Sequence, residues 1–123
     1  MIIETSISAL IPTQASISWK NLERIAMNFD ASKYKPPAVV RYDGNAFLIL
    51  DGHHRLYTDY LRGLENLDVN LIESPVLFQE ESRGRVIKFA SIETFVEYYN
   101  SCLKEIFQRI DLMSVPDFKR FIY

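Results

Sequence analysis

Five consecutive residues in the middle of the chain combine an acid, a glycine, two histidines and an arginine: Asp51, Gly52, His53, His54 and Arg55. A short apolar run ends just before them, and an amphipathic stretch follows. This order predicts a strand, a tight turn and the start of a helix. The first N–H groups of a helix have no partner within the helix, so this position favours anions. We therefore expect an anion-binding site at this turn.

Arg55 is the first candidate for binding the anion, because a guanidinium group donates several hydrogen bonds in a fixed geometry. A surface ion pair with Asp59, four residues further on, is the alternative role. Asp51 either caps the helix by accepting from an N–H of its first turn, or acts as a Mg²⁺ ligand or as a base that deprotonates a hydroxyl nucleophile. The turn thus holds candidates for both binding and catalysis.

The two adjacent histidines would point about 100° apart on a helix, so they cannot easily bind one zinc ion together. The sequence has no third histidine and only one cysteine to complete a tetrahedral zinc site. We expect one histidine to pack or form a hydrogen bond within the fold, and the other, His54, to face the anion.

The elements before the turn follow from apolar periodicity and turn residues. A strand is predicted over residues 2–11, and a helix capped by Ser18 over residues 19–29. Strands over 38–42 and 46–50 should form a hairpin around Asp43-Gly44-Asn45. Pro12, Thr13 and Gln14 follow the first strand, which should lie beside the turn. Thr13 or Gln14 would then reach a ligand, and a loop without ligand contact is the alternative.

The elements after the turn begin with a helix over 53–62 that should end at Gly63. Its inward side chains would be Leu56, Tyr60, Leu61 and Leu64. A strand over 67–73 follows and ends before Pro75. The charged segment 79–88, which includes Arg83 and Arg85, predicts a solvated loop, with a lid or partner-binding arm as the alternative.

The last predicted element is a long helix capped by Ser91 and running from Ile92 to about Leu112. Its broad apolar face would comprise Phe95, Val96, Tyr99, Leu103, Ile106, Phe107 and Ile110. The single cysteine, Cys102, falls in this helix and is expected to be a buried structural thiol. A short turn and a tail that contains Phe118, Phe121, Ile122 and Tyr123 complete the chain.

The length and the order of the predicted elements indicate one α+β domain. The 123 residues are 48% hydrophobic and 24% charged, with a net charge of -2, so no global basic field attracts DNA. The start of the chain is unlike a secretory signal, and no apolar run reaches the roughly 18 residues that span a bilayer. We expect a cytoplasmic protein without membrane association.

The segment from Lys35 to Leu56, together with Gly63, resembles the ParB/sulfiredoxin superfamily. The shared features are the Lys-Pro-Pro-Ala-Val-Val run, the hairpin, and the Leu-Asp-Gly-His-His-Arg-Leu motif that opens a helix ending in glycine. The matching order covers residues 7 to about 72. The resemblance implies a small mixed sheet with packed helices, with a core over about residues 2–74 and a helical extension over about 90–123 that lies outside the shared core.

The resemblance also implies a site for nucleotide phosphates, with ATP or CTP as the ligand and Mg²⁺ as a partner of Asp51. Gly52 would let the backbone approach the phosphates, the N–H groups of His53 and His54 would surround their oxygens, and the side chains of Arg55 and His54 would donate to them. Trp19 and Tyr57 are expected to pack in the core or lie on the surface, with a platform for the base as the alternative.

Differences between this motif and those of the known subfamilies exclude some of the functions that the resemblance would allow. Sulfiredoxins have a catalytic cysteine where this chain has His53, so sulfinic-acid reduction is not expected. Partition proteins have an acid and two arginines after the glycine and a second, DNA-binding domain, for which this chain has no room. The motif is most similar to that of free serine kinases, but those proteins are longer, and no residue here corresponds to their catalytic glutamate.

Three functions follow as hypotheses. The favoured one is nucleotide binding with phosphotransfer or nucleotide hydrolysis, in which Asp51 and His54 are the catalytic candidates. The second is a non-catalytic ligand-sensing or regulatory module whose C-terminal helix forms a homodimer or partner surface. The third is a metal-dependent nuclease, against which the net charge counts.

Overall fold

A computed structural model describes residues 1–13, 35–61, 63–79 and 84–103. This part of the chain is α+β, as the sequence predicts. A five-stranded mixed sheet has the strand order β1-β5-β3-β4-β2, and β6 and β7 form a second, two-stranded sheet. The predicted helix over 19–29 lies outside the described residues, as does the chain beyond residue 103.

The prediction of one strand over residues 2–11 is wrong, because this segment supplies both edges of the large sheet. β1 (Ile2–Ser6) pairs antiparallel with β5 (Asn66–Leu71), whereas β2 (Leu10–Ile11) pairs parallel with β4 (Ala46–Asp51). A 3-10 turn, Ile7–Ala9, separates β1 from β2. Ser6 caps this turn, since its hydroxyl accepts from the N–H of Ser8, and the chain thereby changes direction.

The hairpin at the centre of the sheet is confirmed. β3 (Ala38–Asp43) pairs antiparallel with β4, and it also pairs parallel with β5. Neighbouring residues on these two strands point to opposite faces, yet Val39, Val40, Leu48 and Ile49 are all fully buried. Both faces of the sheet are therefore covered, which explains the unbroken apolar run before Asp51.

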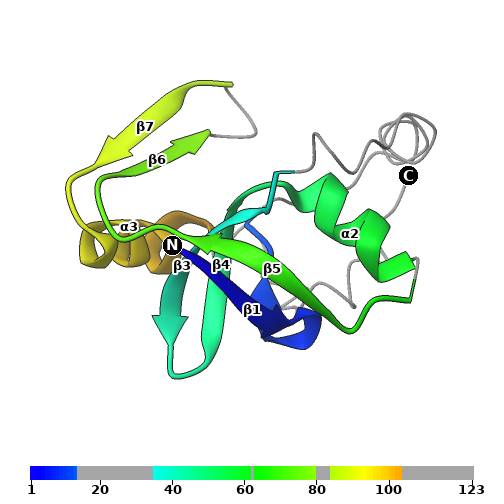
Figure 1. The fold of residues 1–123 in the computed structure, drawn as a ribbon. Coiled ribbons are helices and arrows are strands. Elements are labelled where there is room, and N and C mark those ends of the chain that lie inside the picture. Colours follow the sequence, from blue (N-terminus) through cyan, green and yellow to red (C-terminus); the bar gives the residue numbers. More distant parts are fainter. Residues whose placement is uncertain (14–34, 62, 80–83, 104–123) are drawn as a thin grey trace.

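Different elements cover the two faces (Figure 1). On one face the core surrounds Leu56 of α2 (His53–Leu61) and comprises Ile7, Leu10, Val39, Phe47, Ile49, Leu67, Val69 and Leu71. On the other face β6 (Val76–Gln79), β7 (Val86–Phe89) and α3 (Ile92–Tyr98) build a second core, made of Ile11, Val40, Leu48, Leu50, Val76, Phe78, Phe89, Phe95, Tyr99 and Leu103.

β6 and β7 correct the predicted loop over residues 79–88 at its two ends, Gln79 and residues 86–88, while residues 80–83 lie outside the described residues. Val76 pairs with Phe89 and Gln79 with Val86, which places Phe78 and Phe89 in the core. Because each strand has only four residues and the charges gather between them, the segment resembled a loop in sequence.

The predicted inward position of Leu64 is also wrong, as this residue lies past the end of α2 and is 44% exposed.

The start of the C-terminal helix is confirmed, because the Ser91 hydroxyl accepts from the N–H of Thr94 at 3.2 Å. A π-helical segment, Tyr99–Leu103, continues α3. It keeps Tyr99 and Leu103 buried, four residues apart, and leaves Cys102 exposed, so the prediction of a buried thiol is wrong. No helix within the described ranges is long and apolar enough to cross a membrane.

Candidate anion-binding site

The predicted strand, turn and helix meet at Gly52. The first hydrogen bond of α2 joins the Leu56 N–H to the Gly52 carbonyl at 2.9 Å, so the amides of residues 53–55 lie at the positive end of the helix. Gly52 has a φ of +96°, which side chains rarely tolerate. A Cβ there would lie 2.9 Å from Nη2 of Arg55 and 3.1 Å from Cβ of Pro37. Glycine is thus required by both conformation and space.

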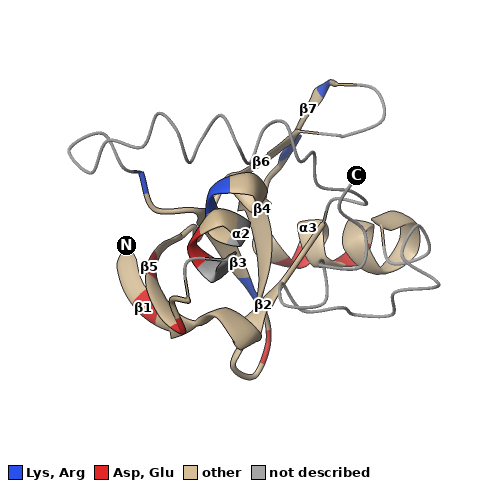
Figure 2. Cartoon of the chain, turned by 90° about the vertical axis from the view of Figure 1, so that its right-hand side faces the viewer, with Lys and Arg blue, Asp and Glu red and all other residues tan. Residues whose placement is uncertain are grey.

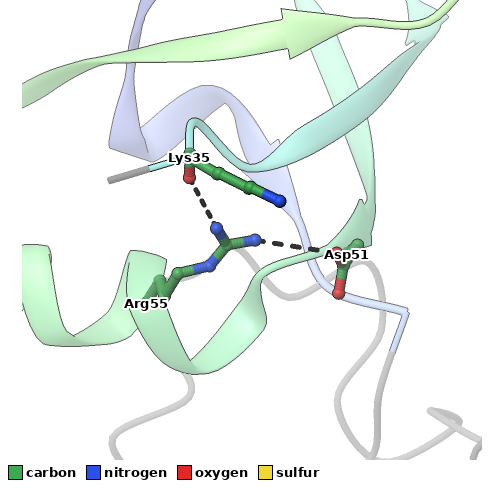
Figure 3. Close-up of polar contacts among 3 residues, drawn as sticks. All are labelled: Lys35, Asp51 and Arg55. Atoms are coloured by element: carbon green, nitrogen blue, oxygen red, sulfur yellow. Dashed lines mark hydrogen bonds and ion pairs between the residues drawn. The ribbon is translucent and has the colours of Figure 1, made fainter. Parts of the chain in front are cut away.

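Arg55 links three segments at this turn. Its Nη1 donates to the Lys35 carbonyl at 2.6 Å, and its Nη2 lies 3.6 Å from Oδ2 of Asp51 (Figure 3). The Arg55 side chain is 28% exposed and that of Asp51 is 82% exposed. The ion pair of Arg55 is therefore formed with Asp51, at the end of β4, and not with Asp59, which is buried in α2.

Asp51 lies one position too early to cap α2, because Gly52 accepts the first helical hydrogen bond. Its carboxylate instead contacts Arg55 in front of the helix. Its roles as Mg²⁺ ligand and as base stay predictions. No cluster of three or more metal-binding side chains occurs among the described residues, and Mg²⁺ commonly combines one or two carboxylates with substrate phosphates.

Of the two histidines, His53 packs within the fold. Only 6% of its surface is exposed, and its Nε2 accepts from the Thr13 N–H at 3.0 Å. Burial, with a smaller contribution from the charge of His54, lowers the pKa of His53 to about 3, so its ring is neutral. His54 is half-buried, and its carbonyl accepts from the Thr58 hydroxyl at 2.8 Å.

Thr13 lies beside the turn, as the sequence predicts. Its side chain is buried, and its hydroxyl donates to the Ile49 carbonyl at 2.6 Å, which fastens the chain after β2 to β4. A contact between Thr13 and a ligand stays a prediction. Gln14 and Trp19 lie outside the described residues, as does the side chain of Tyr57.

Lys35 and Pro37 were not expected to contact the turn. The signal was the Pro36-Pro37 pair, which enforces an extended chain just before β3 and brings this segment against Gly52. The Lys35 and Arg55 side chains both extend toward the end of β4 (Figure 3). Basic residues occur at the start of α2, just before β3, and on β3 and β7, whereas acids occur on β1, β5 and α3 and at the end of β4 beside the start of α2 (Figure 2).

No family model and no curated protein matches the chain. The fold is similar to that of protein Atu1540 from Agrobacterium tumefaciens, with a TM-score of 0.55 and 16% identity over 82% of this chain and 47% of that protein. It is also similar to a glutamate-to-alanine mutant of free serine kinase, solved with ADP and with AMP. The TM-score is 0.51, with 23% identity over 58% of this chain and 30% of the kinase. These likenesses show the fold, over less than half the length of each relative.

Proposed function

We propose that this protein binds the phosphates of a nucleotide, ATP or CTP, at the turn from Gly52 to Arg55. The observation that carries the proposal is the Arg55 guanidinium held against a glycine turn at the positive end of α2. Backbone amides and a guanidinium group directed at one place form an effective anion site. The similarity of the fold to a kinase that binds ADP and AMP supports this choice of ligand.

The contacts of Arg55 leave it able to bind a phosphate. Its hydrogen bond to Lys35 fixes the guanidinium group, while its 3.6 Å contact with Asp51 is longer than a strong charge-assisted hydrogen bond of about 2.8 Å. Phosphate oxygens would take the place of Asp51 beside Nη2. The amides of His53 and His54, the His54 imidazole and the Lys35 ammonium complete the proposed site.

Asp51 is the candidate catalytic residue for a phosphoryl transfer from the bound nucleotide. Its exposed carboxylate would bind a Mg²⁺ ion held by the phosphates, or accept the proton of a hydroxyl nucleophile. In the transfer step, that hydroxyl oxygen bonds to the terminal phosphorus, its proton passes to Asp51, and the bond to the nucleoside diphosphate breaks. Free serine and water are the acceptors to test, given the likeness to free serine kinase.

Binding is tested by calorimetric titration with ATP, CTP, GTP and ADP, with and without Mg²⁺. We expect wild type to bind at least one nucleotide and Arg55→Ala to bind it at least about tenfold more weakly. Arg41→Ala is the matched control, because Arg41 lies on β3 and donates to Gly44 in the hairpin turn. Absence of nucleotide binding by wild type, or equal affinity of Arg55→Ala, would overturn the proposal.

Catalysis is tested by phosphorus NMR of the bound nucleotide with Mg²⁺, in the presence and absence of serine. Phosphoserine or inorganic phosphate that forms with wild type and not with Asp51→Asn supports the transfer step. An intact nucleotide after hours of incubation overturns the transfer step and leaves a binding protein, which is the ligand-sensing function.

A further inference from the structure

A buried hydrogen-bonded cluster lies behind the turn, and its side chains are not among the groups proposed to contact the anion. It consists of His53, the first residue of α2, of Thr13, two residues after β2, and of the Ile49 carbonyl on β4. The Thr13 N–H donates to Nε2 of His53 at 3.0 Å, and the Thr13 hydroxyl donates to Ile49 at 2.6 Å. Both side chains are more than nine-tenths buried.

The donors and acceptors fix the state of the imidazole. A backbone N–H can only donate, so Nε2 of His53 must present its lone pair and the ring proton must lie on Nδ1. The Thr13 hydroxyl donates its proton to the Ile49 carbonyl. Although this hydroxyl lies 3.4 Å from Nε2 of His53, it therefore does not donate a second hydrogen bond to Nε2. Nε2 is thus the acceptor for the Thr13 amide.

The cluster extends the attachment of the β2 segment to the rest of the sheet, which is otherwise short. β2 has only two residues, and its parallel pairing with β4 ends at Ile11 opposite Leu48. Beyond this point Thr13 continues the attachment by its hydroxyl to β4 and by its amide to α2. Both attachments lie within three residues of Gly52, which begins the anion-binding turn.

We propose that His53 is a positioning residue, whose neutral imidazole fastens the chain after β2 to the first turn of α2 and so holds the amides of that turn in place for an anion. The inference rests on the proposed function, because it concerns the same site. His53 touches the ligand with its backbone at most, and its side chain acts through Thr13 and the orientation of the helix.

The test compares two substitutions of His53 by nucleotide titration of folded protein. His53→Gln places an amide oxygen near the position of Nε2 and retains an acceptor, whereas His53→Leu fills the space without one. We expect His53→Leu to bind at least about tenfold more weakly, and His53→Gln to remain within about threefold of wild type. Thr13→Val keeps the backbone donor and separates the contribution of the hydroxyl.

Nitrogen NMR of the wild-type protein gives a second test that does not require the variants to fold. We expect His53 in the tautomer with the proton on Nδ1, and a Thr13 amide protected from hydrogen exchange. A ring protonated on Nε2, or equal affinities of folded His53→Leu and wild type, would overturn the inference. Absence of nucleotide binding by wild type would instead overturn the proposed function, even with the tautomer as expected.

Discussion

The two faces of the large sheet are built from the same central strands but differ in what covers them. α2 contributes a cluster of ionisable residues at its start, beside Gly52, and Leu56 to the core beneath it. The opposite face is covered by rings: Phe78, Phe89, Phe95 and Tyr98 lie with centroids 5.1 to 6.5 Å apart. Ionisable residues thus gather at the edge of one face, whereas aromatic packing dominates the described part of the other.

The proposed anion site and the aromatic packing thus lie on opposite sides of β3 and β4, although each face has a buried core. Aromatic pairs at these distances stabilise a core beyond their buried area. The turn, in contrast, contains a glycine with a positive φ, a buried neutral histidine and a long ion pair, none of which favours folding strongly. Substitutions should therefore separate nucleotide binding from stability.

The largest expected effect is on the aromatic face. Phe95 is fully buried and contacts the rings of Phe78 and Phe89, so Phe95→Ala should lower the free energy of unfolding by about 3–5 kcal/mol. Urea unfolding measures this loss. At a temperature where the variant is folded, nucleotide affinity should equal that of wild type. A weaker affinity would contradict the separation of the two faces.

Gly52→Ala should affect both properties, because the new Cβ meets Arg55 and Pro37 at a φ of +96°. We expect a loss of about 1–3 kcal/mol in the free energy of unfolding, together with weaker nucleotide binding. Gly44→Ala is the matched control, since Gly44 also has a positive φ but has no atom within 4 Å of the new Cβ. Equal effects of the two substitutions on affinity would show that the close approach at Gly52 is unimportant.

The pH dependence of the free energy of unfolding should show the lowered pKa of the buried His53 imidazole. Its pKa is about 3 in the folded protein and about 6.5 when unfolded, so between these values only the unfolded chain binds the proton. Stability should therefore fall as pH decreases through this window, by about 1.4 kcal/mol per pH unit. Comparing wild type with His53→Gln between pH 6.5 and 5 isolates this slope. Parallel curves for the two proteins would contradict a buried neutral imidazole.

Local patterns predicted the elements around the turn. The apolar run before Asp51, the hairpin turn at Gly44 and the stop at Gly63 each depend on neighbours in sequence, and the structure confirms them. The Ser91 cap belongs to the same class. Such signals are strong because one glycine or one hydroxyl determines the backbone locally.

Contacts between residues that are far apart in the chain could not be predicted from the sequence. The hydrogen bond from Arg55 to Lys35 spans 20 residues, and that from Thr13 to His53 spans 40. Sequence alone could predict that one histidine packs and that the other, His54, faces the anion, but not that Thr13 donates a hydrogen bond to His53. Cys102 was misplaced for a related reason, since a π-helical segment changes which side chains point inward.

Nitrogen–proton NMR during separate titrations with ATP and with CTP tests the central claim most directly. If the turn binds the phosphates, the amide signals of Gly52, His53, His54 and Arg55 should shift together with increasing concentration of at least one of these nucleotides, and those of β6, β7 and α3 should stay unchanged. Shifts confined to the aromatic face, or no shifts with either nucleotide, would contradict an anion site at this turn.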